Sequence, residues 1–201
     1  RKICGRLQRR MTNAVDFPDY IERFGPFYVA GQERTGKPWA ADFFTVYRAD
    51  HDERDYSFEG RGWRSAVAGT RTDEMYLDDI QSLRSLNQTG DIIERLRQDF
   101  FSRPGRVGKI VITGTRVGIG DVYEELWEQG IVSESNIVRL PIMDAEGKGL
   151  CPELWPEEAL ERRRALVGED AWWRNYMQKP RHSMDAAFTD AMIEGAHDDL
   201  R

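Results

Sequence analysis

The sequence predicts an α/β fold in which a mainly parallel sheet is flanked by helices. Two short apolar segments, 74–77 and 109–112, have the composition of strands. Apolar residues recur at helical spacing over 89–101, between the two segments, and two neighbouring parallel strands require a crossover connection of this kind. The 201 residues are enough for one sizeable domain of this class.

Both predicted strands end in polar residues. Asp78 and Asp79 follow the first strand, and the triplet Thr113-Gly114-Thr115 follows the second. Working groups in open α/β sheets lie just beyond the carboxyl ends of the strands, so these residues form the candidate site. Acids that hold Mg²⁺ and orient water, beside hydroxyls that sense a γ-phosphate, are typical of a nucleoside triphosphatase. Taken alone, the two acids also fit a solvated turn after a strand.

The first residues of the chain, 1–11, have the pattern of an amphipathic helix, because Ile3, Leu7 and Met11 are spaced by four. Residues 13–38 are turn-rich. Aromatic and β-branched residues then predict strands, with a charged loop between them; the strands are at 43–47 and 63–67, and the loop is at 51–55.

The helix at 89–101 has clear signals at both ends. Thr89 is placed to cap its first turn, Asp91 falls within that turn, and Pro104-Gly105 ends it. The strand at 109–112 is nearly all apolar, which is typical of a strand buried on both faces.

The remaining predicted elements are mainly helical. Pro156 fits the first position of a helix that Gly168 closes, and Gly130 closes an earlier one. The predicted helices are 121–129, 156–168 and 171–178, with a further helix possible at 188–193 and a short strand at 136–140.

The composition excludes several classes of protein. The formal net charge of −6 argues against a uniformly basic nucleic-acid binder, but it leaves local basic patches open. Only Cys4 and Cys151 occur, so the chain encodes no disulfide framework or zinc set, and a reducing compartment is expected. No apolar run approaches the ~18 residues of a membrane span. The three histidines, at 51, 182 and 197, share no spacing that indicates a metal site.

Several stretches carry a family resemblance. Residues 68–80 read Ala-Gly-Thr-Arg-Thr-Asp-Glu-Met-Tyr-Leu-Asp-Asp-Ile, and residues 111–116 read Val-Ile-Thr-Gly-Thr-Arg, followed by Gly-Asp-Val at 120–122. Further along are Leu-Trp-Pro-Glu at 154–157, Leu160, three arginines at 162–164 and Tyr-Met-Gln-Lys-Pro at 176–180. In order and spacing, they resemble the Walker B region, the coupling motif and the closing segment of the ATPase domain in tailed-phage terminase large subunits. The resemblance covers residues 43 to 180.

This resemblance implies a P-loop NTPase fold of the additional-strand type, in an ATP-driven motor that packages double-stranded viral DNA into a procapsid. Asp78 would coordinate Mg²⁺. Asp79 would activate the attacking water or act as a second metal ligand. Thr113, Gly114 and Thr115 would link the phosphate state to domain movement. The resemblance also implies ATP and Mg²⁺ as cofactors. The partners that it implies are double-stranded DNA, the portal protein, the small terminase subunit and further copies of the chain. The location that it implies is the host bacterial cytoplasm during virion assembly.

The chain departs from the family pattern in three ways. The family usually has Glu where Asp79 stands. The phosphate-binding loop and the nuclease domain are both missing, so 1–180 would be the C-terminal part of the ATPase domain and 181–201 a linker. ATP hydrolysis by this chain alone is therefore not expected. Residues 31–38 almost spell a phosphate loop, but Pro38 offers no hydroxyl to Mg²⁺.

Other functions remain open. They are a helicase-like DNA translocase, a non-catalytic assembly module, and a metal-dependent nuclease, which would need further carboxylates beside Asp78 and Asp79. Arg116 could reach a phosphate, contact a neighbouring subunit or lie in solvent. The basic clusters at 1–10 and 162–164 fit solvated helix faces better than DNA contacts. Trp172, Trp173, Tyr176 and Met177 have the spacing of packing residues.

Overall fold

The computed structural model describes residues 2–35, 38–47, 55–66 and 69–181. The chain divides into two compact units, Arg1–Thr72 and Asp73–Arg201, called here the N-terminal and C-terminal units. The prediction of one domain over 1–180 does not anticipate this division. The predicted helix at 188–193, nearly all of the predicted linker at 181–201 and most of the charged loop at 51–55 lie outside the described residues.

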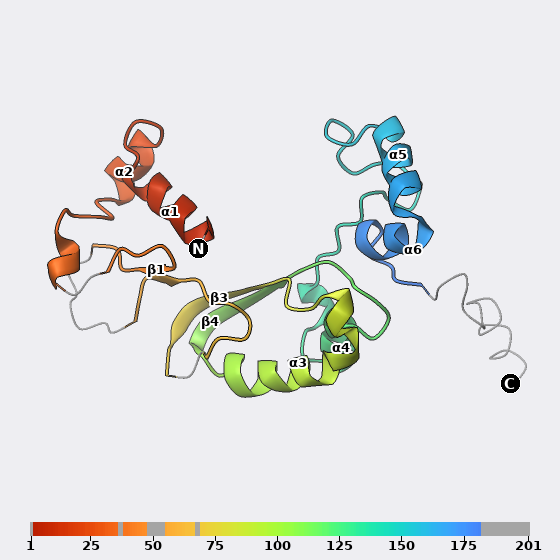
Figure 1. The fold of residues 1–201 in the computed structure, drawn as a ribbon, viewed down its shortest axis with the longest axis horizontal. Coiled ribbons are helices and arrows are strands. Elements are labelled where there is room, and N and C mark those ends of the chain that lie inside the picture. The colour runs from red at the N-terminus through yellow and green to blue at the C-terminus, as the bar shows by residue number, and fades with distance from the viewer. Residues whose placement is uncertain (1, 36–37, 48–54, 67–68, 182–201) are drawn as a thin grey trace, which may run out of the picture. The chain divides into compact units, whose positions relative to one another are not determined.

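The N-terminal unit is built from two helices, a 3₁₀ turn and a two-stranded antiparallel sheet (Figure 1). The helix predicted at the start of the chain is confirmed as α1, and a second helix, α2, begins at Pro18 within the stretch predicted as turns. The elements are α1 Lys2–Thr12, α2 Pro18–Phe24, η1 Gln32–Thr35, β1 Phe43–Phe44 and β2 Phe58–Glu59.

The strand predictions for this unit are only partly confirmed. The strand at 43–47 shortens to the two residues of β1, which pair with β2. The strand at 63–67 is wrong, because residues 63–66 form turns and irregular chain. The pairing partner is instead Phe58, whose ring stacks on Phe44 with centroids 5.6 Å apart. The partner strand is therefore stabilised by aromatic packing, which the alternation of residues along the sequence does not reveal.

The core of the N-terminal unit is aromatic. Phe44 is fully buried and also packs against Trp39 at a centroid distance of 4.9 Å. Helix α1 is fastened to this region by two side chains. The buried Cys4 thiol donates to the carbonyl of Asp42 at 3.2 Å, and the Gln8 amide donates to the carbonyl of Ala40 at 2.7 Å.

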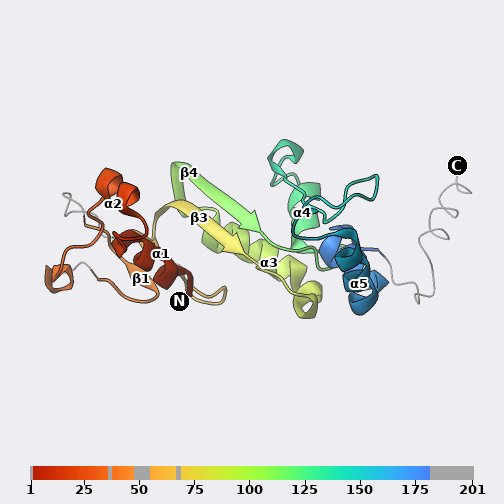
Figure 2. The ribbon, with the colours of Figure 1, turned by 90° about the horizontal axis from the view of Figure 1, so that it is seen from above.

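The C-terminal unit contains a small parallel sheet flanked by helices, which is compatible with the α/β class. Strand β3, Thr72–Asp78, and strand β4, Pro104–Thr113, lie side by side and point the same way (Figures 1 and 2). The crossover between them is helical and packs against α4. Its elements are η2 Leu83–Gln88, α3 Thr89–Arg95 and η3 Leu96–Phe100, and α4 is Val122–Glu128.

The crossover helix is confirmed, but its predicted cap is wrong. Thr89 does not cap the helix, because η2 runs directly into α3 and leaves no free first turn there. Its hydroxyl instead donates to the carbonyl of Leu86 at 2.7 Å. The side chains between the helices and the sheet form an apolar core, comprising Leu77, Ile80, Ile92, Ile93, Leu96, Phe100, Val117, Val122 and Leu126.

The expectation that the second strand is buried on both faces is also wrong. Val111 is 38% exposed and Val107 81% exposed. A parallel strand is buried on both faces when strands flank it and helices cover both sides of the sheet. Within the described residues β4 has only β3 as a strand neighbour, so part of its apolar surface remains in solvent.

The remainder of the unit is helical. The strand predicted at 136–140 is wrong, because the short η4, Glu134–Asn136, is followed by irregular chain. The two helices predicted near 156–168 and 171–178 are confirmed as α5, Glu157–Val167, and as α6, Glu169–Ala171, continued by η5, Trp172–Tyr176. Trp172 is 2% exposed and stacks on Tyr176, so its packing role is confirmed. Among the described helices, none has the length and apolar character needed to cross a membrane.

Candidate functional site

The two predicted polar stretches meet at the carboxyl ends of β3 and β4. The Thr113 hydroxyl donates to Oδ1 of Asp78 at 2.6 Å, across 35 residues of sequence. The backbone N–H of Asp79 donates to the carbonyl of Thr113 at 3.0 Å, which continues the strand pairing one residue past the end of β3. Asp78, Asp79 and Thr113 are all exposed. The structure therefore brings a carboxylate and a hydroxyl together in solvent at one sheet edge.

Asp79 has an unusual backbone conformation, with φ at 47°. This left-handed region is costly for most side chains, but Asp and Asn enter it more readily than others because their short polar groups bond locally. The chain therefore turns sharply at Asp79. Its carboxylate stands on a turn directly after Asp78 rather than on the strand itself.

Gly114 is required by the close approach of Tyr123, a residue of α4. A Cβ atom built on Gly114 would lie 1.7 Å from the hydroxyl oxygen of Tyr123 and 2.4 Å from the ring carbon that carries it. The Tyr123 hydroxyl also donates to the carbonyl of Thr113 at 3.4 Å. The first turn of α4 thus rests directly on the backbone of the predicted triplet. Thr115, the last residue of the triplet, is half-buried.

Tyr123 lies in a strongly acidic environment. Its pKa rises to about 12, mainly because the phenol is buried and to a lesser extent because of the negative charges of Asp79, Asp121 and Asp78, in that order. The phenol therefore stays protonated at neutral pH and acts as a hydrogen-bond donor. No signal in the sequence identifies Tyr123, because its contact with the triplet depends on how α4 docks.

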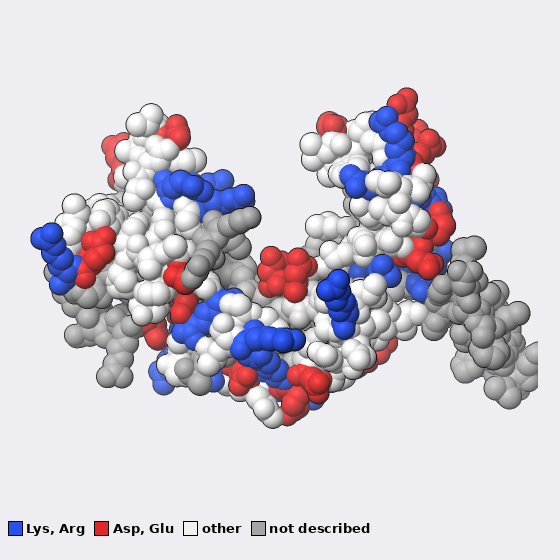
Figure 3. Space-filling model, viewed as in Figure 1, with Lys and Arg blue, Asp and Glu red and all other residues white. Residues whose placement is uncertain are grey.

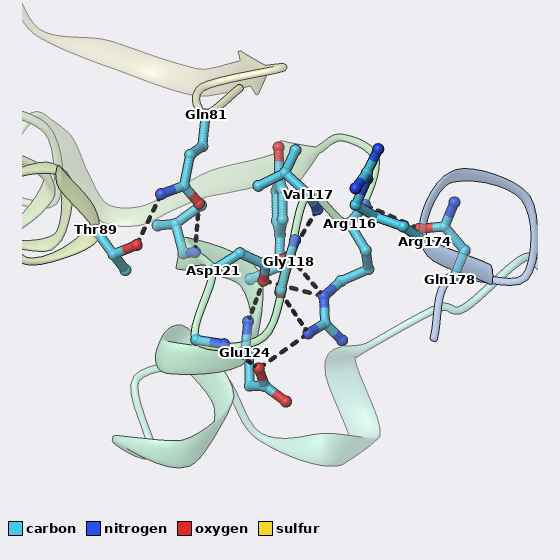
Figure 4. Close-up of polar contacts among 12 residues, drawn as sticks. Gln81, Thr89, Arg116, Val117, Gly118, Asp121, Glu124, Arg174 and Gln178 are labelled. Carbon is cyan, nitrogen blue, oxygen red and sulfur yellow. Dashed lines mark hydrogen bonds and ion pairs between the residues drawn. The ribbon is translucent and has the colours of Figure 1, made fainter. Parts of the chain in front are cut away.

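Arg116 is held within its own loop. Its Nε donates to both carboxylate oxygens of Asp121, at 3.0 and 2.8 Å, and its Nη2 lies 3.0 Å from Glu124 (Figure 4). Its backbone N–H donates to Oε1 of Gln178 at 3.1 Å. In this arrangement the Arg116 guanidinium neutralises a buried carboxylate, which is a role that the sequence did not suggest.

Asp121 organises the segment between β4 and α4. Its side chain is fully buried and accepts the backbone N–H groups of Val117, Gly118 and Glu124 at 2.8, 3.3 and 3.1 Å. The last of these bonds makes Asp121 the N-cap of α4. A buried carboxylate is stable only when it is paired and hydrogen-bonded, and Asp121 meets both conditions.

Gln81 ties this segment to the crossover helix. Its Oε1 accepts the backbone N–H of Val122 at 2.7 Å, and its Nε2 donates to the hydroxyl of Thr89 at 2.8 Å (Figure 4). Gly118 packs against Leu86, because a Cβ there would lie 2.5 Å from a methyl group of that side chain. The predicted triplet is therefore followed by a segment that is anchored at several points.

The donor set at the sheet edge matches what Mg²⁺ prefers. Asp78, Asp79 and Thr113 present only oxygen atoms, and Mg²⁺ in phosphate-transfer sites is usually bound through one or two carboxylates together with substrate phosphates. Among the described residues no three His, Cys, Asp or Glu side chains gather closely enough to bind a metal by themselves. Two acids and a hydroxyl are donors that can supply part of the coordination of Mg²⁺.

Two other predicted features lie elsewhere. The segment at 31–38 has a sequence that resembles a phosphate-binding loop. Within it η1 occupies Gln32–Thr35, and residues 36–37 lie outside the described part of the chain. In the basic cluster at 162–164, Arg163 lies over the ring of Trp155, and Arg164 pairs with Glu169 at 2.6 Å. Comparison with known proteins adds nothing to this picture: no family model matches the chain, and no curated protein matches it.

Proposed function

We propose that this chain is part of an ATP-driven motor that packages double-stranded viral DNA, similar to a tailed-phage terminase large subunit. The fold proposed for it is that of an additional-strand P-loop NTPase. ATP would be the substrate and Mg²⁺ its metal, while the portal protein, the small terminase subunit and further copies of the chain would be partners in the host bacterial cytoplasm.

The contact between Asp78 and Thr113 carries this proposal. An acid and a hydroxyl at the ends of adjacent parallel strands are the arrangement that a nucleoside triphosphatase uses to read its substrate. The two groups already share a hydrogen bond of 2.6 Å. An arriving phosphate would compete for the Thr113 hydroxyl, so this bond is the first that nucleotide would rearrange.

Each residue of the site has a role that follows from its position. Asp78 and Asp79 would hold Mg²⁺, which when bound neutralises charge on the phosphates. Asp79, on its sharp turn, would also orient the attacking water. Thr113 and Thr115 would donate to the phosphate, and Gly114 would transmit the change to Tyr123, against which it packs.

The left-handed turn gives a physical account of the Asp at position 79. At φ 47° an Asp is more easily accommodated than a Glu, because a longer side chain loses the local bonds that offset the strain. The turn in the backbone, rather than a longer side chain, would then bring the Asp79 carboxylate to the water.

A metal-dependent nuclease is less well supported. Two-metal nucleases need several carboxylates around one site, and the strand end beside Asp78 supplies the hydroxyl of Thr113 instead.

The test of the proposal is ATP hydrolysis by the full-length protein. Asp78→Asn should lower the rate by about 100-fold or more, because removing preorganised charge at a reacting centre has effects of that size. Asp73→Asn is the matched control, since Asp73 is an exposed acid on the same strand. A rate for Asp78→Asn within about twofold of wild type would refute the proposal.

A second pair of variants tests the role of Asp79. Asp79→Ala should abolish hydrolysis, whereas Asp79→Glu should retain substantial activity if the carboxylate orients water. Equal inactivity of the two variants, with Asp79→Glu as stable to denaturation as wild type, would remove Asp79 from that role. The 201-residue chain alone contains no Gly-x-x-x-x-Gly-Lys-Ser/Thr sequence and should hydrolyse ATP only at background rate.

A further inference from the structure

One face of α1 gathers positive charge. Arg6, Arg9 and Arg10 are spaced by three and four residues, so they lie on one side of the helix, and all three are exposed. No acidic residue occurs within Lys2–Thr12. Figure 3 shows basic side chains gathered along this helix. We call Arg6, Arg9 and Arg10 the α1 basic face.

Other described side chains of α1 pack within the N-terminal unit. Cys4 is buried, Leu7 and Met11 are partly buried, and the Gln8 amide donates to the carbonyl of Ala40. A helix that lies in a membrane interface needs a free apolar face to insert. The described part of α1 uses its apolar residues internally and leaves its cations in water.

The arginines of this face have no acidic partner among the described residues. Within the described part of the chain no carboxylate forms an ion pair with any of the three, although the Arg10 guanidinium lies 5.8 Å from the ring centroid of Phe17. Other arginines behave differently, since Arg61 is paired with Glu59 at 2.6 Å.

The two units also differ in net charge. Residues 1–72 contain 13 Lys and Arg against 10 Asp and Glu, a formal charge of +3. Residues 73–201 contain 16 against 25, a formal charge of −9, and together the units give the −6 of the whole chain. At about 0.1 M salt, charges more than about 10 Å apart are largely screened, so the local cluster decides what binds to it.

We propose that the α1 basic face binds the phosphate backbone of double-stranded DNA. Guanidinium groups match phosphate oxygens in a two-pronged geometry and remain charged at every physiological pH. Three arginines on one helix face supply contacts that carry no sequence information, as a motor that moves along any DNA requires. This inference deepens the proposed function, because it names the surface that would grip the DNA.

The test is binding of a short fluorescein-labelled DNA duplex to the 201-residue chain, without nucleotide, over about 50–200 mM salt. The variant Arg6→Gln/Arg9→Gln/Arg10→Gln should lose about tenfold or more in affinity at the lowest salt. The slope of log affinity against log salt should shrink by about two to three, since each phosphate contact contributes about 0.9. A second duplex of unrelated sequence should give the same result.

Two further variants test whether any loss of affinity comes from the α1 basic face or from a change in the total charge of the chain. Arg34→Gln/Arg64→Gln/Arg71→Gln removes the same charge from exposed positions outside α1 and should bind within about twofold of wild type. Arg6→Lys/Arg9→Lys/Arg10→Lys keeps the charge and should retain most of the salt slope. Circular dichroism checks that every variant is folded.

The proposal is overturned if wild type does not bind the duplex, or if the two Gln variants lose affinity equally. It is also overturned if the α1 variant changes binding to anionic lipid vesicles but not to DNA. None of these measurements involves ATP, so failure here is distinct from failure of the Asp78→Asn test.

Discussion

Each unit of the chain uses a buried polar side chain to hold a loop, but the two side chains differ in charge. In the N-terminal unit Gln32 is 5% exposed; its amide donates to the carbonyl of Thr45 at 2.7 Å, and its Oε1 accepts the N–H of Val29 at 2.9 Å. In the C-terminal unit Asp121 is fully buried and accepts hydrogen bonds from Arg116 and from backbone groups.

The two loops are therefore stabilised by different interactions, one by a neutral amide and the other by a buried carboxylate. A neutral amide contributes ordinary hydrogen bonds, and the N-terminal unit around it has an aromatic core. A buried carboxylate stabilises only while its partners are present, and the removal of one partner leaves an unpaired charge. The segment beside the candidate site therefore depends on charge, whereas the loop in the N-terminal unit does not.

The largest expected effect is that of Asp121→Ala. It removes the buried carboxylate that pairs with Arg116 and leaves the backbone N–H groups of Val117, Gly118 and Glu124 without their acceptor, so the free energy of unfolding of the C-terminal unit should fall by about 3–5 kcal/mol. Chemical denaturation measures the loss, and hydrogen exchange shows which unit opens. Asp73→Ala, an exposed acid, is the control. Equal loss of protection from hydrogen exchange in both units would show that Asp121 does not stabilise the C-terminal unit in particular.

Gly114→Ala should have the next largest effect. The new methyl group would collide with the Tyr123 hydroxyl, and overpacking of this kind costs about 1–3 kcal/mol. Tyr123→Leu removes the colliding atoms, so the double variant should be less destabilised than the sum of the two single variants. Strict additivity would show that the two residues are not in contact.

Gln32→Ala should cost less than Asp121→Ala, about 1–2 kcal/mol, because a neutral side chain leaves behind no unpaired charge. The neighbouring exposed Arg34 provides the control, and Arg34→Ala should change the free energy of unfolding by no more than about 0.5 kcal/mol. A loss at Gln32 as large as that at Asp121 would mean that charge does not distinguish the two loops.

The sequence predicted the parts of the fold that local signals specify. The crossover helix and β3 follow from the pattern of apolar residues, and α4 and α5 follow in addition from the glycines that close them. The meeting of Asp78 and Thr113 followed from one rule about parallel strands.

What the sequence did not predict depends on contacts between distant segments. The strand partner of Phe44 was decided by the ring of Phe58, and 136–140 is irregular although its residues suit a strand. The contact of Tyr123 with Gly114 and the burial of Asp121 exist only after α4 docks. Periodicity within one segment holds no information about such contacts.

The smallest expected effect concerns two tyrosines, one in each unit. Hydrogen bonding to Glu33 raises the pKa of Tyr28, whereas burial is the main reason that the pKa of Tyr123 rises from 10.0 to about 12. Glu33→Gln should therefore remove most of the shift at Tyr28. Asp79→Asn should remove only part of the shift at Tyr123, because burial remains.

Titration of phenolate absorbance measures both values, with Tyr28→Phe and Tyr123→Phe used to isolate each signal. Because folding raises the pKa of Tyr123, its contribution to stability is complete below about pH 10 and is lost as the pH rises towards 12. The ring is partly exposed, and solvent screening reduces this contribution to below about 1 kcal/mol. If Asp79→Asn instead returned the pKa of Tyr123 to 10.0, charge rather than burial would control the phenol. The acidic site would then act on α4 through its electrostatic field rather than through packing.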